Sequence, residues 1–205
     1  MSSGSPSASP LTSADETLTR LVGNRCILRP VIPDDIGLLY RWETGSPFAF
    51  RWRLAGQHLS PQAYAESIWS GVLAHFIIIA DSHPIGIATG YGADFRHQFC
   101  YLAMARFDEH DQRTNIGAAH LSVEAFTLLL NYLFNGWNFR KIYMDVPGYN
   151  LDQFSSLIGR LCTEEACLTD HLYLGGRYWN LHTLAITRES WNEFRITHWR
   201  SLGLH

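Results

Sequence analysis

The order of expected elements indicates an α/β fold, in which a mixed, mostly antiparallel sheet of six to seven strands is flanked by helices. Apolar and polar residues repeat with strand or helix periods in the order β-α-α-β-β-β-α-β-α-β-β-α along the chain. One long helical stretch joins two strands through short connections. Those two strands should run parallel at the centre of the sheet, because a helical crossover returns the chain in the same direction.

The expected strands are short runs rich in β-branched and aromatic residues. They span residues 25–29, 76–80, 85–91, 99–107 and 141–146, and two closing strands flank the Gly175-Gly176 turn. The expected helices are bounded by capping or helix-breaking residues. They run from Pro33 to the breakers Gly45 and Pro47, from Pro61 to about Leu73, from Ile116 to Asn135-Gly136, from Leu151 to Leu161, and onward from a cap at Thr187.

The composition is that of one globular domain with a tail. The 205 residues carry a net charge of −3 and are 46% apolar, a balance that argues against a nucleic-acid partner. No run approaches the ~18 apolar residues of a membrane span, so we expect no membrane partner and a cytoplasmic protein. Residues 1–20 should form a disordered Ser/Pro/Ala-rich tail that lacks the features of a secretory signal, and residues 21–205 a single domain.

The cysteines show no spacing typical of a metal site. Cys26, Cys100, Cys162 and Cys167 form no C-x-x-C pair, and no histidines cluster beside them. In apolar or helix-like runs a free cysteine behaves as a small hydrophobic residue. We therefore expect no bound metal.

The stretch 107–119 (FDEHDQRTNIGAA) is the segment best suited to binding a ligand. It joins a strand to the N-terminus of the long helix through a polar turn. Backbone N–H groups and the positive end of the helix dipole favour a pyrophosphate there. Gly117 allows close approach of a ligand, and Ala118 and Ala119 keep that face small. The alternative is an ordinary β–α loop whose small residues serve packing.

Residues 112–117 (QRTNIG) resemble the pyrophosphate loop Q/R-x-x-G-x-G/A of the GNAT acyltransferases, which follows that family's fourth strand. Asn150 resembles the asparagine that opens the family's fourth helix. The C-terminal runs 175–182 and 187–191, together with Leu28-Arg29-Pro30, resemble the branch that acetylates the N-terminal alanine of ribosomal proteins and its small-molecule relatives. The resemblance covers roughly residues 25–195.

The resemblance implies an acyl-CoA-dependent N-acyltransferase that uses acetyl-CoA as co-substrate and acts as a monomer or homodimer. An amine of a small molecule or of a peptide or protein N-terminus attacks the thioester directly in a ternary complex. Backbone N–H groups at about Phe107 and Asp108 polarise the thioester carbonyl. The residues implied to bind the donor are Phe107, Asp108, Gln112, Arg113, Thr114, Asn115, Ile116, Gly117, Ala118, Ala119 and Asn150.

Several positions depart from the family pattern, among them Leu161-Cys162, which stand where the family's fourth helix usually ends in Gly-Phe. Asn115 stands where the loop has its first glycine, although asparagine tolerates left-handed backbone better than most residues. Leu157 stands where many members have a tyrosine general acid, and residues 100–102 (CYL) offer no glutamate base. Donor binding is therefore better supported than any catalytic group.

Four side chains are candidates for proton transfer. Asp94, His97 and His182 are candidate bases for the attacking amine, and Tyr101 is a candidate acid for the leaving thiolate. Each also has an ordinary structural interpretation: Asp94 and His97 as turn residues, His182 and Tyr101 as side chains packed in the core. We therefore predict that no single side chain is an indispensable base.

The connector between the first two helices lies where the family binds its acceptor. Phe50 and Trp52 suit an aromatic wall, with Arg51 and Arg53 at its rim. Two guanidinium groups would suit an acceptor that carries a carboxylate or phosphate beside its amine. The alternative is that these residues pack across the sheet edge.

Two other functions stay open. The same fold could use a larger acyl-CoA, or it could be a non-catalytic acyl-CoA-binding module, which the missing tyrosine and glutamate favour. Release of free thiol from acetyl-CoA in the presence of amines separates catalysis from binding alone.

Overall fold

One eight-stranded sheet organises the part of the chain that the computed structural model describes, residues 19–45, 49–107 and 116–202. Its strands lie in the order β1-β2-β3-β4-β5-β6-β8-β7. The strands are β1 (Leu21–Val22), β2 (Ile27–Pro30), β3 (Val72–Ala80), β4 (His83–Asp94), β5 (Phe99–Arg106), β6 (Lys141–Pro147), β7 (Thr163–Leu174) and β8 (Arg177–Thr187). The helices are α1 (Ile36–Thr44), α2 (Pro61–Ser67), α3 (Ile116–Gly136) and α4 (Arg188–Leu202), with the 3-10 helices η2 (Pro33–Asp35) and η3 (Gly148–Phe154).

The strand directions confirm the predicted fold class. β5 and β6 run parallel, and the other neighbouring pairs of described strands are antiparallel. The chain crosses from β5 to β6 through α3, as expected. The additional strand is β1, which pairs with β2 over two residues. A period-2 pattern cannot be recognised in two residues, so the sequence did not reveal it.

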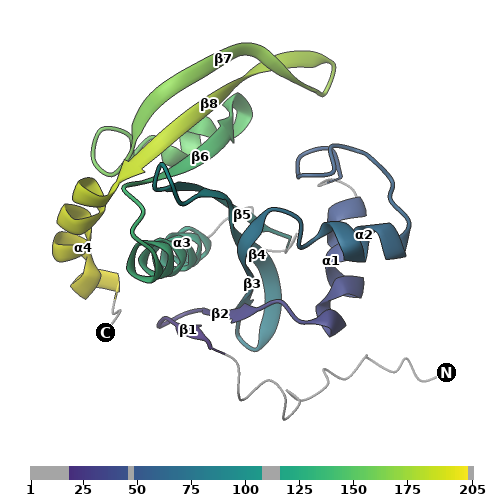
Figure 1. The fold of residues 1–205 in the computed structure, drawn as a ribbon, viewed down its shortest axis with the longest axis horizontal. Coiled ribbons are helices and arrows are strands. Elements are labelled where there is room, and N and C mark those ends of the chain that lie inside the picture. The colour runs from purple at the N-terminus through teal and green to yellow at the C-terminus, as the bar shows by residue number, and fades with distance from the viewer. Residues whose placement is uncertain (1–18, 46–48, 108–115, 203–205) are drawn as a thin grey trace.

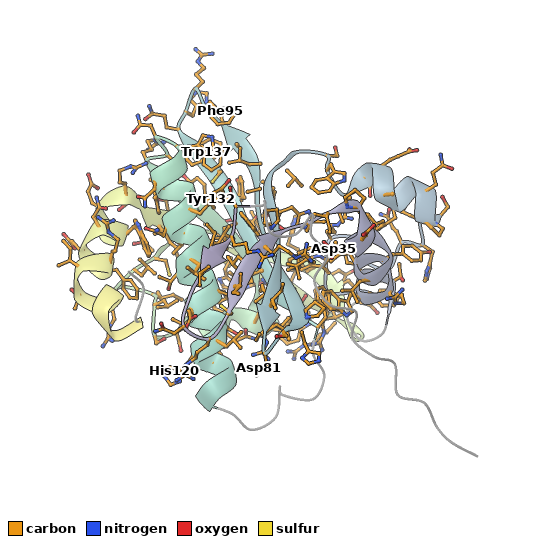
Figure 2. All side chains as sticks on the ribbon, turned by 90° about the horizontal axis from the view of Figure 1, so that it is seen from below. Asp35, Asp81, Phe95, His120, Tyr132 and Trp137 are labelled. Atoms are coloured by element: carbon orange, nitrogen blue, oxygen red, sulfur yellow. The ribbon has the colours of Figure 1, made fainter. Side chains whose placement is uncertain are left out.

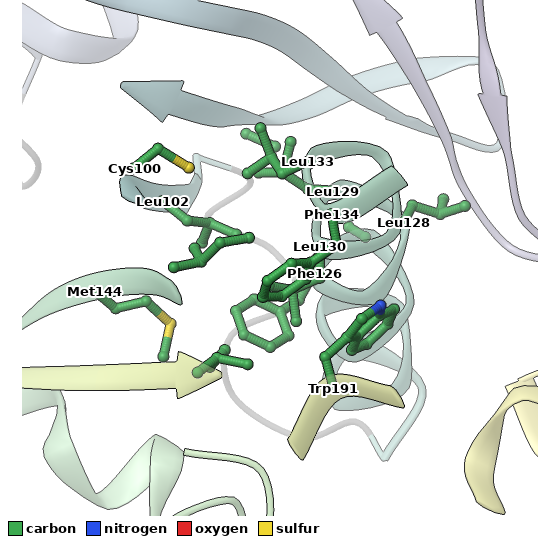
Figure 3. Close-up of a cluster of buried hydrophobic side chains, with 14 of the residues drawn as sticks. Cys100, Leu102, Phe126, Leu128, Leu129, Leu130, Leu133, Phe134, Met144 and Trp191 are labelled. Atoms are coloured by element: carbon green, nitrogen blue, oxygen red, sulfur yellow. The ribbon is translucent and has the colours of Figure 1, made fainter. Parts of the chain in front are cut away.

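Helices cover both faces of the sheet (Figure 1): α1 and α2 lie on one face, and α3 and α4 lie on the other. The larger apolar cluster lies under α3, where Leu129 and Leu133 pack with Cys100 and Leu102 of β5 and with Trp191 of α4 (Figure 3). A second cluster lies under α1 and α2. Its buried members are Val31, Leu39, Leu54, Tyr64, Ile68, Ile77, Ile87 and Phe107.

Two predicted helices are shorter in the structure. The helix expected to reach Leu73 ends at Ser67, because Gly71 adopts a φ of +68° and β3 begins at Val72. The helix expected over 151–161 is instead the 3-10 helix η3. There the Ser155 hydroxyl donates to the Asp152 carbonyl at 2.8 Å, a local bond that competes with helical pairing. Gly159 then turns the chain with a φ of +80°.

The expected cap of the last helix is confirmed. The Thr187 hydroxyl accepts from the Ser190 amide at 3.1 Å, which satisfies one of the free N–H groups at the start of α4. Within the described residues, no helix is long and apolar enough to cross a membrane. The predicted tail falls mainly on residues 1–18, which lie outside the described part of the chain.

Candidate functional site

The central feature is the place where the two parallel strands separate. β5 and β6 pair at three consecutive positions that end at Tyr101 and Tyr143, although β5 continues to Arg106 and β6 to Pro147. We call the opening beyond these tyrosines the splay. Strands that stop pairing leave backbone N–H and C=O groups for which a ligand can supply hydrogen bonds.

Alternate residues of β5 direct their backbone groups into the splay. The Phe107 amide donates to the Ile85 carbonyl of β4 at 2.8 Å, so it faces away from the splay. Successive residues of a strand direct their backbone groups to opposite neighbours, and Leu102 and Met104 therefore direct theirs toward β6. Of the two expected carbonyl-polarising donors, Phe107 is thus engaged with β4, and Asp108 lies outside the described residues.

Most of the expected donor-binding segment lies outside the described residues, namely Asp108, Gln112, Arg113, Thr114 and Asn115. Ile116, Gly117 and Ala118 begin α3, Ala119 is exposed, and Asn150 is half-buried in η3.

The start of α3 lies at the open end of the splay. Figure 2 shows His120, in the second turn of α3, at the same end of the sheet as Asp81 in the β3–β4 turn. The last residue of β5, Arg106, pairs with Gly86 at that same end. The positive end of the α3 dipole is therefore placed where β5 and β6 have separated.

Three tyrosines line the sheet where the splay begins. Cys100 and Leu102 pack under α3, so Tyr101 between them points to the opposite face, which carries α1 and α2. The Tyr101 ring lies 5.5 Å from the rings of both Tyr91 and Tyr143. We call this surface the tyrosine face.

The hydroxyls of Tyr91 and Tyr101 stay protonated near neutral pH. Burial, and then the negative charge of Asp145, raise the pKa of Tyr91 to about 12. Burial and the same carboxylate also raise the pKa of Tyr101 above its usual value. A phenol with a raised pKa remains a hydrogen-bond donor, which is what a leaving thiolate requires.

Two carboxylates on this face were missed by the sequence reasoning. Asp145 accepts from the Thr183 hydroxyl at 2.8 Å and is exposed two residues beyond the last β5–β6 pair. Glu165 accepts from Lys141 and from the Tyr143 hydroxyl, and the Lys141 contact lowers the pKa of Glu165. Alternation with the buried residues of strand KIYMDV would have marked Asp145 as facing away from the core.

Asp94 and His97 lie at the other end of the sheet. Asp94 ends β4 and accepts from the His97 amide at 2.8 Å, and the His97 ring lies 2.9 Å away. The His97 contacts lower the pKa of Asp94. Their neighbour Phe95 stacks on Phe139 and lies near Trp137, far from His120 at the start of α3 (Figure 2). The structure thus separates both residues from the open end of the splay.

His182 lies on the face opposite the tyrosines. It pairs with Val146 of β6, whose buried side chain belongs to the cluster under α3. Its Nδ1 lies 2.9 Å from the Glu164 carboxylate, and its side chain is 13% exposed. Of the expected catalytic residues, Tyr101 is the one that the structure places at the splay on the tyrosine face.

The connector between α1 and α2 holds its two arginines differently. The Arg53 Nε lies 2.7 Å from the carboxylate of Glu43, which is fully buried in α1, and the guanidinium lies over the Tyr64 ring. Burial raises the pKa of Glu43 despite the attraction of Arg53. Trp52 packs edge-on against Phe107. Arg53 and Trp52 thus join the connector to the core.

Arg51 points instead toward the C-terminal half of the chain. Its guanidinium lies 5.8 Å from the centre of the Tyr149 ring, and Tyr149 contacts Trp179 of β8 edge-on. Phe50 is 67% exposed. An exposed guanidinium therefore stands where the connector approaches η3 and β8.

The comparisons with known proteins find similar structures. No protein-family model matches the chain, and no curated protein matches its sequence. Spermidine N-acetyltransferase from Vibrio cholerae, solved with CoA and spermine, superposes with a TM-score of 0.65 at 17% identity, covering 82% of this chain and 98% of that one. A chimera of the Vibrio cholerae enzyme SpeG and hSSAT superposes with a TM-score of 0.65 at 16% identity, covering 82% and 99%.

These similarities extend over nearly the whole of the other chains and over 82% of this one. At 16–17% identity they concern the arrangement of the backbone. The chain has the GNAT acetyltransferase fold.

Proposed function

We propose that the protein transfers an acetyl group from acetyl-CoA to the primary amine of a small molecule. The observation that carries this proposal is the splay, which opens at the start of α3 within a fold shared with acetyltransferases. CoA in a solved neighbour supports the choice of donor.

The donor binds across the open end of the splay. Its pyrophosphate lies at the N-terminus of α3, near Gly117, where backbone N–H groups and the helix dipole favour negative charge. The backbone amides of Leu102 and Met104 face the separated strand β6, and they take over from Phe107 and Asp108 as our proposed donors to the thioester carbonyl.

The acceptor approaches from the tyrosine face. Its ammonium group first loses a proton to water beside the exposed carboxylate of Asp145. The amine nitrogen then attacks the carbonyl carbon, the carbon–sulfur bond breaks, and the Tyr101 hydroxyl gives its proton to the leaving thiolate. The second proton that the nitrogen loses as the amide forms also passes to water. Tyr101 is protonated again from solvent, which completes the cycle.

The charges around this face suggest what the acceptor carries. Lys141 neutralises Glu165, which leaves Asp145 to attract the ammonium group. Arg51 stands at the rim beside Tyr149, where it suits a carboxylate or phosphate on the same molecule. We therefore propose an acceptor with an anionic group near its amine, unlike the polyamine bound in the solved neighbour.

The test combines donor binding with turnover. Acetyl-CoA at ~100 times its dissociation constant should stabilise the protein by roughly 2.7 kcal/mol, measured as a rise in melting temperature. Gly117→Trp should remove that rise. Gly136→Trp, at the other end of α3, is the matched control, because a Cβ atom added at Gly136 meets no atom within 4 Å. No shift in the wild-type protein would refute donor binding.

Thiol release is then followed with amino acids, phosphorylated amines, polyamines and peptides as acceptors. Release that depends on an added amine supports transfer. Stabilisation without release with any amine would point to the non-catalytic CoA-binding module, and faster release from longer acyl-CoAs would point to a different donor.

A further inference from the structure

The β7–β8 hairpin brings together three metal-ligating side chains that the acetyl-transfer proposal does not use. Glu164 and Cys167 lie on β7, and His182 lies on β8. One potential ligand atom from each of the three residues lies within 4.8 Å of the other two. We call this group the hairpin cluster.

A bulge in β7 creates the cluster. Glu164 pairs with Leu184 and Cys167 with His182, and the register shifts between Glu164 and Ala166. In a regular strand, residues three apart point to opposite faces. The extra residue of a bulge restores a common face, so Glu164 and Cys167 both stand beside His182.

The bulged residue itself takes no part in the cluster. Glu165 bonds Lys141 and Tyr143 on the tyrosine face, so the lysine that could compete for a carboxylate is held on the other side of the sheet. Glu164 contacts His182 Nδ1 at 2.9 Å. One carboxylate and one imidazole are thus already oriented toward each other.

Access to the cluster differs from access to the other thiols. Cys167 is exposed, whereas Cys26, Cys100 and Cys162 are buried. The His182 side chain is 13% exposed and that of Glu164 is 38% exposed. An ion can therefore reach the cluster from solvent, while the histidine ring is held by its surroundings.

We propose that the hairpin cluster binds Zn²⁺ through Cys167, His182 and Glu164, with water as the fourth ligand. A thiolate and an imidazole select zinc over the hard cations Mg²⁺ and Ca²⁺, which prefer oxygen. Zn–S and Zn–N bonds of ~2.0–2.3 Å place tetrahedral ligand atoms ~3.3–3.8 Å apart. The potential ligand atoms lie within 4.8 Å of one another, so small side-chain rotations bring them into that range.

The test uses the full chain, reduced and freed of metal by a chelator. Titration with Co²⁺, which takes the same ligands as zinc, should produce a thiolate-to-cobalt charge-transfer band that saturates at one ion per chain. Cys167→Ser should abolish the band, and Cys162→Ser, at a buried thiol, should leave it unchanged. Zn²⁺ should displace the Co²⁺, and Mg²⁺ should not.

Affinity for Zn²⁺ is measured by competition with a chromophoric chelator. His182→Gln and Glu164→Gln should each weaken binding by at least the ~10–100-fold that loss of an outer-shell partner costs at metal sites, while His171→Gln on the exposed part of β7 should not. Circular dichroism confirms that each variant is folded. The proposal would be overturned if Co²⁺ produced no charge-transfer band, or if the band persisted in Cys167→Ser. It would also be overturned if all variants bound Zn²⁺ with equal affinity. None of these readouts depends on acetyl transfer.

Discussion

Tyr101 stands at the last β5–β6 pair, with its hydroxyl on the face from which we expect the acceptor. Burial and the charge of Asp145 raise its pKa, so the phenol is protonated at neutral pH and carries the proton that the leaving thiolate takes. Tyr101→Phe keeps the ring contacts with Tyr91 and Tyr143 and removes the proton. We expect kcat to fall by ~10²–10⁴-fold, the usual contribution of a positioned acid, with little change in acetyl-CoA affinity.

The control is Tyr91→Phe, which removes a neighbouring phenol one strand farther from the splay and should change kcat less than about 10-fold. Equal rates for wild type and Tyr101→Phe would exclude Tyr101 as the acid. Water would then be the proton donor to the thiolate.

His75 should make the fold sensitive to mild acid. It is buried in β3. Burial, and then the positive charge of Arg53, lower its pKa from 6.5 to about 4. Between these values the unfolded chain binds a proton that the folded chain does not. Stability is therefore lost as the pH falls through this window, by roughly 3 kcal/mol in all.

His75→Phe should remove that part of the pH dependence. The new ring keeps the edge-on packing against Trp69, and a cavity of about 190 Å³ beside both residues can take its extra volume. Urea unfolding between pH 7 and pH 4 measures the effect, with the exposed His171→Phe as control. Parallel stability curves for wild type and His75→Phe would contradict the prediction.

At the scale of elements, Arg188 joins the end of α3 to the start of α4. Its guanidinium donates to the carbonyls of Phe134, Trp137 and Phe139 at 2.8–2.9 Å, where the negative end of the helix dipole also favours a cation. Arg188→Lys keeps the charge, but one ammonium group cannot reach three diverging carbonyls. We expect a loss of about 2–4 kcal/mol in the free energy of unfolding.

Urea denaturation checks this value. The exposed Arg160→Lys should change stability by less than about 0.5 kcal/mol. Faster amide hydrogen exchange at the C-terminal end of α3 in Arg188→Lys would locate the effect, whereas equal stability of the two variants would mean that the three bonds contribute nothing net.

The elements that were predicted correctly from sequence are those whose periodicity is long and whose caps are chemically distinct. α3 has 21 residues of helical period, and Thr187 carries its own capping hydroxyl. η3 was mistaken for an α-helix because a few apolar residues fit either period, while the deciding Ser155–Asp152 bond is local. Asp145 was missed although its strand was predicted, because its role depends on where two strands part.

The hairpin cluster could not be predicted for a related reason. Its ligands come from two strands, and they meet through a register shift that no residue pattern announces. The C-x-x-C and histidine spacings that mark a metal site in sequence require the ligands to lie within one or two turns of chain. Ligands that come together only because two strands pair leave no such spacing in the sequence.

At the scale of the molecule, the connector between α1 and α2 reaches both the buried core and the C-terminal strands. Arg53 bonds the buried Glu43, and Phe107 stacks on Trp42 and meets Trp52 edge-on. Phe107 directly precedes the segment that we expect to hold the donor. The same connector carries Arg51 toward Tyr149 and Trp179. The proposed acceptor and donor sites therefore share one packed unit.

Replacing each of the two arginines with alanine should therefore change different properties: stability for Arg53, and the KM of the acceptor for Arg51. Arg53→Ala leaves the Glu43 carboxylate buried without its cation. We expect the free energy of unfolding to fall by about 3 kcal/mol, which is at the lower end of the usual cost of breaking a buried ion pair because Arg53 is partly exposed. Arg51→Ala removes an exposed side chain and should cost less than about 0.5 kcal/mol, yet raise the KM for an anionic acceptor about 10-fold while acetyl-CoA affinity stays constant. Urea unfolding and steady-state kinetics on both variants separate the two effects. A lower KM in Arg51→Ala, with a polyamine as the best substrate, would show that the rim arginine repels the acceptor and that the acceptor is cationic.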